Sequence, residues 1–313
     1  SFMLSACNFY MPIFEEALDA YGLPLELRYL PIIESALNPS AVSRAGASGL
    51  WQFMIGTGKI YGLESNSLVD ERRDPIKATW AAARYLKEMY DIYGDWNLVI
   101  AAYNCGPGTI NKAIRRANGE TDYWKIYNYL PKETRGYVPA FIAANYVMTY
   151  YCDHNICPME TNIPASTDTV QVNKNLHFEQ IADLCNVPLD QIKSLNPQYK
   201  KQMIPGDSKP YTLRLPIDAI STFIDKQDTI YTHRADELFR NRKTVAVKDI
   251  TPATRKTTSA VAGKGNLTYY TIKSGDTLST IARKYGVTIK DIQRWNGMSS
   301  TKIAAGKRLK IYK

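Results

Sequence analysis

Long apolar runs and histidine are both scarce in this chain of 313 residues. No stretch of 18 or more apolar residues occurs, so the sequence predicts no transmembrane helix. The three histidines have no partners at metal-ligand spacing, and we therefore expect neither a metal site nor another cofactor. The chain also lacks a recognised nucleic-acid-binding motif, which argues against a nucleic acid partner despite a net charge of +9.

That charge is unevenly distributed along the chain. Residues 234–313 hold 18 Lys and Arg against 5 Asp and Glu, so this end carries +13 and residues 1–233 carry −4. The basic end would attract an anionic polymer over a long range. An apolar content of 45% is normal for globular folding, and the length allows two or three domains.

The most informative residue is Glu34, because it occupies a position where a helical pattern calls for an apolar side chain. Leu23, Leu27, Leu30, Glu34 and Leu37 are spaced by four, three, four and three residues, which places them on one face of a helix. Burial of a carboxyl group disfavours its charged form and raises its pKa. A carboxylic acid that stays protonated near neutral pH suits general-acid catalysis.

Two features leave the role of Glu34 open at this point. Pro31 removes a backbone donor, and a kink there would change the face on which Glu34 lies. Alternatively, Glu34 would point into a polar pocket and pair with an arginine such as Arg28 or Arg44.

Three later segments place polar groups beside predicted helix ends. Residues 38–54 are rich in Gly, Ser and Ala, which allows a ligand to approach the backbone closely, and Gln52 adds an amide. Tyr103 and Asn104 end an apolar helical stretch before a glycine-proline stop. Residues 133–139 lead into a further apolar helix.

Together with Glu34, these segments resemble, in order, the motifs of the lytic transglycosylases of glycoside hydrolase family 23. The similarity covers about residues 10–150, and an ordered set of motifs is more specific than any one of them. The matching residues are 34–35, 49–54, 70–75, 102–104 and 135–139.

The resemblance implies a mainly helical, lysozyme-like catalytic domain that cleaves the β-1,4 bond between N-acetylmuramic acid and N-acetylglucosamine in peptidoglycan. Glu34 would protonate the leaving oxygen and then take a proton from the muramic acid 6-hydroxyl, which gives a 1,6-anhydro end without a second carboxylate. Ser35 would steady Glu34 or a sugar, and Met54 would pack against the substrate. The cleft would be lined by Gln52, Tyr103, Asn104 and Tyr137.

Two other functions remain open. A lysozyme-type hydrolase on the same fold would need a second carboxylate, for which Asp70, Glu71 and Asp74 are the best candidates. Acids at a helix start are more often caps, and Pro75 after Asp74 fits a first helical turn. A non-catalytic wall-binding protein would use the cleft only to hold glycan, which an intact Glu34 argues against.

The second half of the chain contains a repeat. Shifting the sequence by 100 residues aligns Ile181 with Ile281 and Ile192 with Ile292, among other apolar positions. The later copy resembles a LysM module, a βααβ unit that binds N-acetylglucosamine-containing glycans in a shallow groove between two loops. The groove residues implied by this resemblance are Gly275, Asp276, Thr277, Leu278, Lys302, Ile303 and Ala304.

Two positions in the repeat have an alternative role. Asp276 and Thr277 are also suitable N-caps for the helix that follows them. The earlier copy keeps the apolar frame but has Asn175, Leu176 and His177 where the later copy has its first groove loop. We therefore expect a LysM-like fold whose glycan binding is doubtful and which mainly buttresses the catalytic domain.

These patterns predict an α+β protein with a helical catalytic domain and two small βααβ modules. A polar, basic linker would let the terminal module search for glycan near the enzyme. The predicted segments are a catalytic domain at 1–163, a degenerate LysM-like module at 168–217, the linker at 234–265 and a LysM module at 268–312.

The compartment is inferred from the resemblance and from the chain's first residues. A wall enzyme should carry a signal peptide, and the chain starts at Ser1 without one, so we expect a removed or omitted leader that would also hold any lipid anchor. We expect a monomer that acts on peptidoglycan strands in the periplasm of a bacterial envelope, with or without outer-membrane anchoring. Such an oxidising compartment would allow a disulfide between Cys152 and Cys157.

Overall fold

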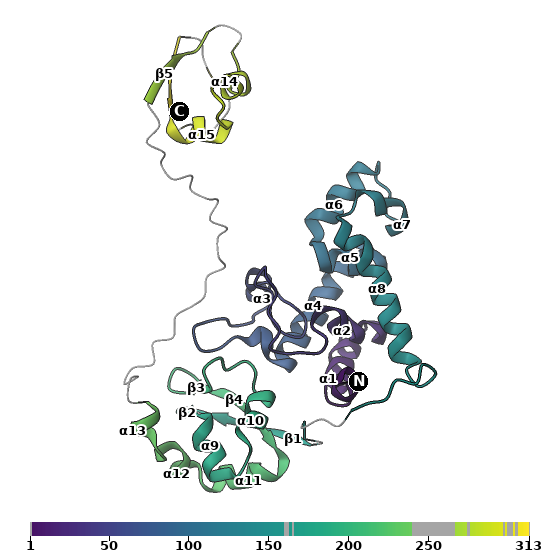
Figure 1. Ribbon diagram of the computed structural model, residues 1–313, viewed down its shortest axis with the longest axis vertical. Coiled ribbons are helices and arrows are strands. Elements are labelled where there is room, and N and C mark those ends of the chain that lie inside the picture. Colours follow the sequence, from purple (N-terminus) through teal and green to yellow (C-terminus); the bar gives the residue numbers. More distant parts are fainter. Residues whose placement is uncertain are drawn as a thin grey trace. The chain divides into compact units, whose positions relative to one another are not determined.

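The computed structural model describes residues 2–159, 163–164, 166–239, 267–273, 276–296 and 306–312, together with residues 298 and 303. The chain divides into two compact units, Ser1–Pro252 and Ala253–Lys313, and each is described by itself. The first unit contains a large helical part and a smaller α+β part, and the second unit is a small α+β module (Figure 1). The α+β class predicted from the sequence is therefore confirmed.

The helical part of the first unit consists of α-helices joined by 3-10 segments and loops. Its elements are α1 (Phe2–Ala20), η1 (Leu25–Tyr29), α2 (Leu30–Ser35), α3 (Ile55–Ile60), η2 (Glu71–Arg73), α4 (Pro75–Tyr93), α5 (Trp96–Cys105), α6 (Pro107–Arg116), α7 (Tyr123–Ile126), η3 (Tyr127–Tyr129) and α8 (Lys132–Thr149). Within the described part of the chain, no helix is both long and apolar enough to cross a membrane.

Helix boundaries in this part follow local sequence signals. The Asp74 carboxylate accepts hydrogen bonds from the backbone N–H groups of Ile76 and Lys77 and so caps α4. Gly94 ends the same helix in the left-handed conformation that glycine adopts readily. The next helix, α5, begins at once because the Asp95 carboxylate accepts the N–H of a residue in its first turn.

The single helix predicted for residues 23–37 is wrong, because the structure divides this segment at Leu30. The 3-10 helix η1 precedes α2, and Pro31 lies in the first turn of α2, where its missing N–H breaks no hydrogen bond. The predicted apolar face is nevertheless correct. Its buried leucines are Leu23, Leu27, Leu30 and Leu37.

One hydrophobic core fills the helical part and anchors the loop between α2 and α3. Trp51 of this loop is fully buried, with its ring edge against Phe14 of α1 at a centroid distance of 5.3 Å. The Trp51 indole N–H donates to Thr79 Oγ1 of α4 at 2.9 Å, so the polar atom of the side chain is satisfied. The loop is therefore fixed between α1 and α4.

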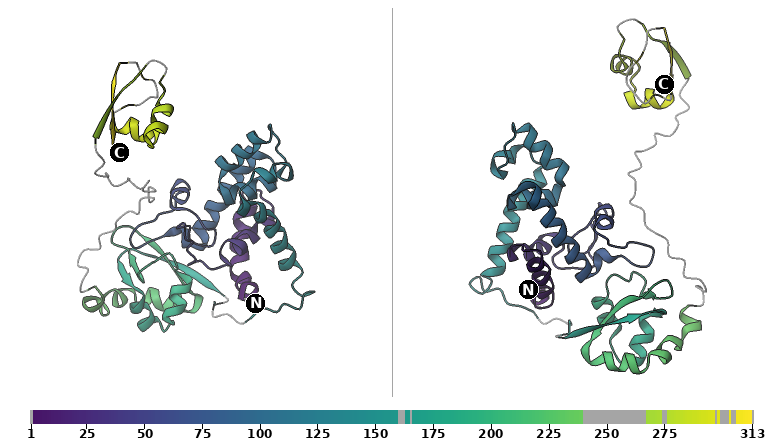
Figure 2. Two further views of the ribbon diagram at one scale, coloured as in Figure 1. Left: turned by 45° about the horizontal axis from the view of Figure 1, so that its top comes forward. Right: turned by 180° about the vertical axis from the view of Figure 1, so that it is seen from behind.

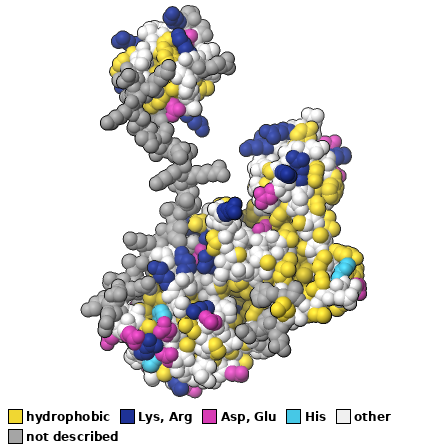
Figure 3. Space-filling model, viewed as in Figure 1, with side chains coloured by type: hydrophobic (Ala, Val, Ile, Leu, Met, Phe, Trp, Pro, Cys, Tyr) yellow, Lys and Arg dark blue, Asp and Glu magenta, His cyan; other side chains and the backbone are white. Residues whose placement is uncertain are grey.

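The surface of the helical part carries a local basic cluster that segment-wide charge counting does not reveal. In Figure 3, lysine and arginine side chains gather at the end where Figure 1 places α6. The last turn of α6 contains Arg115 and Arg116. A net charge of −4 over residues 1–233 thus does not describe the charge at every face.

The smaller part of the first unit has its own core. Its strands form two antiparallel pairs, β1 with β4 and β2 with β3. The elements are β1 (Thr167–Val172), β2 (Asn175–His177), α9 (Phe178–Cys185), α10 (Leu189–Leu195), β3 (Met203–Pro205), β4 (Tyr211–Pro216), α11 (Ile217–Asp225), α12 (Gln227–Thr232) and α13 (Ala235–Leu238).

This core continues past residue 217, where we had placed the end of the module. Phe223 of α11 and Ile230 of α12 are fully buried in it. Phe239, which lies inside the predicted linker, packs against the same core. Residues 240–265 of the predicted linker lie outside the described residues. We use the name LysM-like module below for residues 166–239.

The second unit has the βααβ order predicted for a LysM module. Its elements are β5 (Leu267–Thr271), α14 (Leu278–Tyr285), α15 (Ile289–Trp295) and β6 (Arg308–Tyr312), with β5 antiparallel to β6. Its core buries Tyr270, Ile272, Leu278, Ile281, Ala282, Ile292, Leu309 and Ile311.

The two modules share polar contacts as well as apolar positions. Asn196 donates to the carbonyl oxygen of Arg214 at 2.8 Å and accepts the N–H of Arg214 at 2.8 Å. Asn296 makes the same two bonds with Lys310, at 2.9 and 2.7 Å. In both copies, an asparagine after the second helix therefore fixes the last strand.

Candidate active site

Glu34 lies near the end of α2, at the point where α2 meets α8. The Tyr137 hydroxyl of α8 donates a hydrogen bond to Glu34 Oε1. Burial raises the pKa of Glu34 to about 7; the Tyr137 hydrogen bond works against this rise, and the charge of Glu133 adds to it. Near neutral pH, the site therefore holds a carboxyl group in both its protonated and its ionised forms.

Tyr103 of α5 completes the group around Glu34. Burial raises its pKa well above the usual value, and the charge of Glu34 raises it further, which shows that the two side chains are close. The Tyr103 hydroxyl donates to the Trp51 carbonyl oxygen at 2.7 Å. The structure thus brings together Glu34, Tyr103 and Tyr137 from three helices, and both tyrosines remain neutral hydrogen-bonding groups.

The side chains of Ser35 and Gln52 form hydrogen bonds with backbone carbonyl oxygens in or beside the loop between α2 and α3. The Ser35 hydroxyl lies 2.9 Å from the Leu50 carbonyl oxygen and 3.0 Å from the Pro31 carbonyl oxygen, so its proton is used within the protein. The Gln52 amide donates to the carbonyl oxygen of Gly49 at 2.8 Å. These hydrogen bonds stabilise the loop beside Glu34, and those of Ser35 go to the backbone and not to the Glu34 carboxyl group.

Asn104 forms a hydrogen bond within the protein, whereas the side chain of Met54 is exposed. Asn104 Oδ1 accepts a hydrogen bond from the Thr134 hydroxyl at 2.8 Å, which ties the end of α5 to α8. Met54 precedes α3 and is 46% exposed, so a large apolar side chain is available to a ligand. Their roles in binding substrate remain predictions.

The backbone near Glu34 is strained. Ala36 and Leu37, which directly follow α2, have φ values of 52° and 58°, and Gln52 has a φ value of 47°. Left-handed conformations are costly for residues with a side chain, and such outliers concentrate at functional sites. Nothing in the residue types at these positions predicts them.

The two arginines proposed as alternative partners of Glu34 lie elsewhere. Arg28 forms an ion pair with Glu15 of α1 and donates to the Tyr29 hydroxyl at 3.0 Å. Arg44 is exposed on the loop between α2 and α3. The partner found for Glu34 is instead Tyr137, 103 residues farther along the chain.

The three acids considered as a second carboxylate have structural contacts. Asp70 is 2% exposed and forms an ion pair with Arg72 at 2.8 Å, and Glu71 is 5% exposed and pairs with Lys77. Asp74 caps α4, as described above. These contacts give each of the three acids a structural role in the fold.

The predicted groove of the terminal LysM module is only partly described. Asp276 accepts hydrogen bonds from the Tyr270 hydroxyl and the Lys273 N–H, and Thr277 Oγ1 accepts the Thr280 N–H at 3.2 Å, as expected for a helix start. Leu278 is buried in the module core. Ile303 is half-buried, whereas Gly275, Lys302 and Ala304 lie outside the described residues.

In the LysM-like module, the corresponding segments are joined as strands. Asn175, Leu176 and His177 of β2 pair with residues 203–205 of β3. The His177 ring accepts the Glu179 N–H, and this histidine forms a capping box with the third residue of α9. His177 is thus a cap, and in the described part of the chain no cluster of metal-binding side chains is found.

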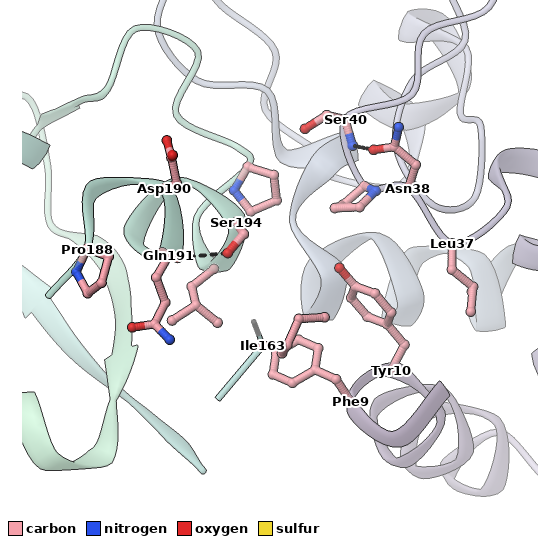
Figure 4. A pocket seen from close by; sticks show the side chains of 13 residues that line it. Phe9, Tyr10, Leu37, Asn38, Ser40, Ile163, Pro188, Asp190, Gln191 and Ser194 are labelled. Atoms are coloured by element: carbon pink, nitrogen blue, oxygen red, sulfur yellow. Dashed lines mark hydrogen bonds between the residues drawn. The ribbon is translucent and has the colours of Figure 1, made fainter. Parts of the chain in front are cut away.

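A large cleft lies outside the Glu34 group. It has a volume of about 1010 Å³ and lies between α1 with residues 37–40 and α10 with the residues beside it (Figure 4). Its walls include Phe9, Pro39, Gln191 and Ser194, and Asp190 at its edge is exposed. Among the described residues that line it, the one buried ionisable side chain is the phenol of Tyr10 and there is no buried carboxyl group, so we base the assignment of chemistry on Glu34.

Comparison with protein families gives three matches along the chain. Residues 11–126 match the family described as Transglycosylase SLT domain. Residues 166–232 match the family described as Lytic transglycosylase MltD, LysM-like domain, and residues 270–311 match the LysM domain. Glu34, Ser35, Gln52, Met54, Tyr103 and Asn104 all lie within the first match.

Individual proteins give a consistent result. The chain is 33% identical over 294 residues to "Membrane-bound lytic murein transglycosylase D" of Escherichia coli K12, covering 93% of this chain and 60% of that protein. It is 33% identical over 124 residues to "Soluble lytic murein transglycosylase" of the same strain, covering 38% of this chain and 19% of that protein. The match to a solved structure of the 70 kDa soluble lytic transglycosylase of Escherichia coli covers 46% of this chain and 24% of the solved chain. The sequence identity is 29% and the TM-score is 0.40.

Proposed function

Because the chain carries a transglycosylase SLT domain together with an MltD-type LysM-like domain and a LysM domain, we propose that it is a peptidoglycan lytic transglycosylase. The substrate would be the β-1,4 bond between N-acetylmuramic acid and N-acetylglucosamine, and the product a 1,6-anhydromuramic acid end. The chain spans about 60% of the length of the first curated relative that it matches.

One observation carries this proposal. Burial raises the pKa of the Glu34 carboxyl group to about 7, and the Tyr137 hydroxyl donates a hydrogen bond to one of its oxygens. A general acid works best when its pKa lies near the working pH, because it must both lose and regain a proton in each turnover.

The reaction would use the Glu34 carboxyl group twice, first as an acid and then as a base. Glu34 gives its proton to the glycosidic oxygen as the bond from this oxygen to the muramic acid C1 breaks. The new carboxylate is stabilised by the Tyr137 hydroxyl and then takes the proton of the muramic acid 6-hydroxyl. The 6-oxygen bonds to C1, and Glu34 returns to its protonated form. No water is consumed. Asp70 and Glu71 are engaged in ion pairs and Asp74 caps α4, which favours this route over a hydrolysis that needs a second free carboxylate.

The terminal LysM module would keep the enzyme on its polymer. It carries much of the positive charge of residues 234–313, and glycan strands with free peptide carboxylates are anionic. Two linked sites on one polymer raise the local concentration of each. We place the protein in the bacterial cell envelope, on the periplasmic side, as a monomer.

The test is digestion of purified peptidoglycan by the parent protein, by Glu34→Gln and by the matched exposed substitution Glu16→Gln. We expect soluble muropeptides from the parent and Glu16→Gln at equal rates and none from Glu34→Gln. Release by Glu34→Gln at the parental rate would remove Glu34 from the mechanism. Binding of peptidoglycan by all three proteins without release would indicate a non-catalytic wall-binding protein.

A further inference from the structure

The LysM-like module is attached to the helical part along the loop that joins α3 to α4. Figures 1 and 2 show this loop beside the module, and its Val69 is fully buried in the module core. The Asp70 N–H donates to the Gln198 carbonyl oxygen at 2.9 Å, and the Lys200 N–H donates to the Leu68 carbonyl oxygen at 2.8 Å. Residues 64–70 are therefore held as an added edge of the module, and we call them the docking segment.

Side chains of the module strengthen this attachment. The Tyr211 hydroxyl of β4 donates to Glu64 Oε1 at 3.0 Å, and Lys209 forms an ion pair with Glu64 at 2.6 Å. The Lys200 ammonium group donates to the carbonyl oxygen of Asn66. These contacts reach the docking segment from one side only, that of the module.

Arg72 joins the docking segment to the loop beside Glu34. Its guanidinium group forms two hydrogen bonds with the Asp70 carboxylate, at 2.9 and 2.8 Å, and both side chains are almost fully buried. The third nitrogen donates to the carbonyl oxygens of Gly46 and Phe53, at 2.8 and 2.9 Å. One planar, rigid side chain therefore clamps both ends of residues 46–53.

The backbone of Arg72 also lies against this loop. At Gly49, which has a φ value of 89°, an added Cβ would lie only 1.7 Å from the Arg72 carbonyl oxygen. Glycine is therefore required both by the conformation and by the close approach. The loop and the residues around Arg72 are packed as one block.

Residues 46–53 in turn provide the backbone acceptors of the active site. The Leu50 carbonyl oxygen accepts from Ser35, next to Glu34, and the Trp51 carbonyl oxygen accepts from Tyr103. We propose that Arg72 is a positioning residue through which docking of the LysM-like module fixes residues 46–53 and hence the surroundings of Glu34. In this role, the module serves the catalytic domain as a brace.

The first arm of the test measures hydrogen exchange and needs no activity. In the chain of 313 residues, the double variant Lys200→Met with Tyr211→Phe removes side-chain contacts of the module to the docking segment and changes no residue of the site. We expect amide exchange in residues 46–53 to become about tenfold faster. The matched control, Lys193→Met with Tyr231→Phe, changes the same residue types elsewhere on the module and should leave that exchange unchanged.

The second arm measures turnover and rests on the proposed function. Arg72→Lys keeps a positive charge beside Asp70, but its one nitrogen, with three donors, cannot replace the four hydrogen bonds that the guanidinium group makes to Asp70 and to the two carbonyl oxygens. We expect kcat to fall about tenfold with KM nearly unchanged, because the loop positions the acid without binding most of the glycan. We also expect the alkaline limb of the pH profile to move to lower pH as water reaches Glu34, whose charged and titratable neighbours Tyr137, Tyr103 and Glu133 are unchanged.

The outcomes separate this inference from the proposed function. Faster exchange in the docking segment of the double variant, with residues 46–53 as protected as in the parent, would overturn the brace. So would an Arg72→Lys protein that folds and keeps the parental kcat and pH profile. If the parent does not cleave peptidoglycan at all, the proposed function fails, and the exchange arm still decides whether the module fixes the loop.

Discussion

Replacing Glu34 by Gln should stabilise the folded protein while it abolishes cleavage, and the gain should grow with pH. Burial raises the pKa of Glu34 from 4.5 to about 7. Between these values the folded protein binds more protons than the unfolded chain, so the free energy of unfolding falls as pH rises through this range. Gln is neutral at every pH and keeps an oxygen for the Tyr137 hydroxyl, so it removes this dependence.

The magnitude follows from the two pKa values. At 1.36 kcal/mol for each pKa unit, the ionised carboxylate costs the folded state about 3 kcal/mol at pH 8 and about 1 kcal/mol at pH 5. Glu34→Gln should therefore raise the free energy of unfolding by about 2 kcal/mol more at pH 8 than at pH 5.

Urea denaturation followed by tryptophan fluorescence provides the assay. Four of the five tryptophans lie between residues 51 and 124, so the signal reports mainly on the helical part. Glu16→Gln, on the exposed face of α1, is the matched control and should show the same effect at both pH values. An equal effect of Glu34→Gln at pH 5 and pH 8 would refute the claim that Glu34 is held as a desolvated acid.

Three further predictions concern the site, the scaffold and the terminal module. The alkaline limb of kcat/KM should have an apparent pKa of about 7, because the protonated acid is lost above this pH. Tyr137→Phe should move this limb to higher pH, because the lost hydrogen bond stabilised the carboxylate. Both effects are measured in pH profiles of muropeptide release, and a limb at unchanged pH in Tyr137→Phe would contradict the role of Tyr137. Asp74→Ala should lower the free energy of unfolding by about 1 kcal/mol through loss of the α4 cap, with the same cleavage products, whereas a change of products would restore this acid as a catalytic candidate. Removal of residues 267–313 should weaken cosedimentation with insoluble peptidoglycan but leave cleavage of short soluble glycans unchanged, and equal loss of both would show that the module acts on catalysis itself.

Some of this structure was predictable because the determinants are local or repeated. The spacing of Leu23, Leu27, Leu30 and Leu37 placed Glu34 on a buried face, even though the segment is divided at Leu30 into a 3-10 helix and an α-helix. Matching apolar positions 100 residues apart indicated two modules of one fold, and the paired contacts of Asn196 and Asn296 follow from the same repeat. These signals arise from periodicities of helices and from a duplicated frame.

Other features depend on contacts that no local pattern encodes. The bond between Tyr137 and Glu34 requires α8 to cross α2, and the acceptors of Ser35 and Tyr103 are backbone carbonyl oxygens, which have no signature in the residue types. The buried pair of Asp70 and Arg72 was the least predictable. An acid-rich stretch indicated either a second carboxylate or a cap for these positions, and tertiary packing decided for an ion pair.

The most direct test of the account is digestion of peptidoglycan in water enriched with oxygen-18, followed by mass spectrometry of the new saccharide ends. If Glu34 protonates the glycosidic oxygen and the 6-hydroxyl then attacks C1, the products are 1,6-anhydromuramic acid ends. These ends are lighter than reducing ends by one water and carry no oxygen-18. Reducing ends that carry oxygen-18 would show that water attacks. The protein would then be a hydrolase, and the mechanism built on Glu34 as the only catalytic carboxyl group would be wrong.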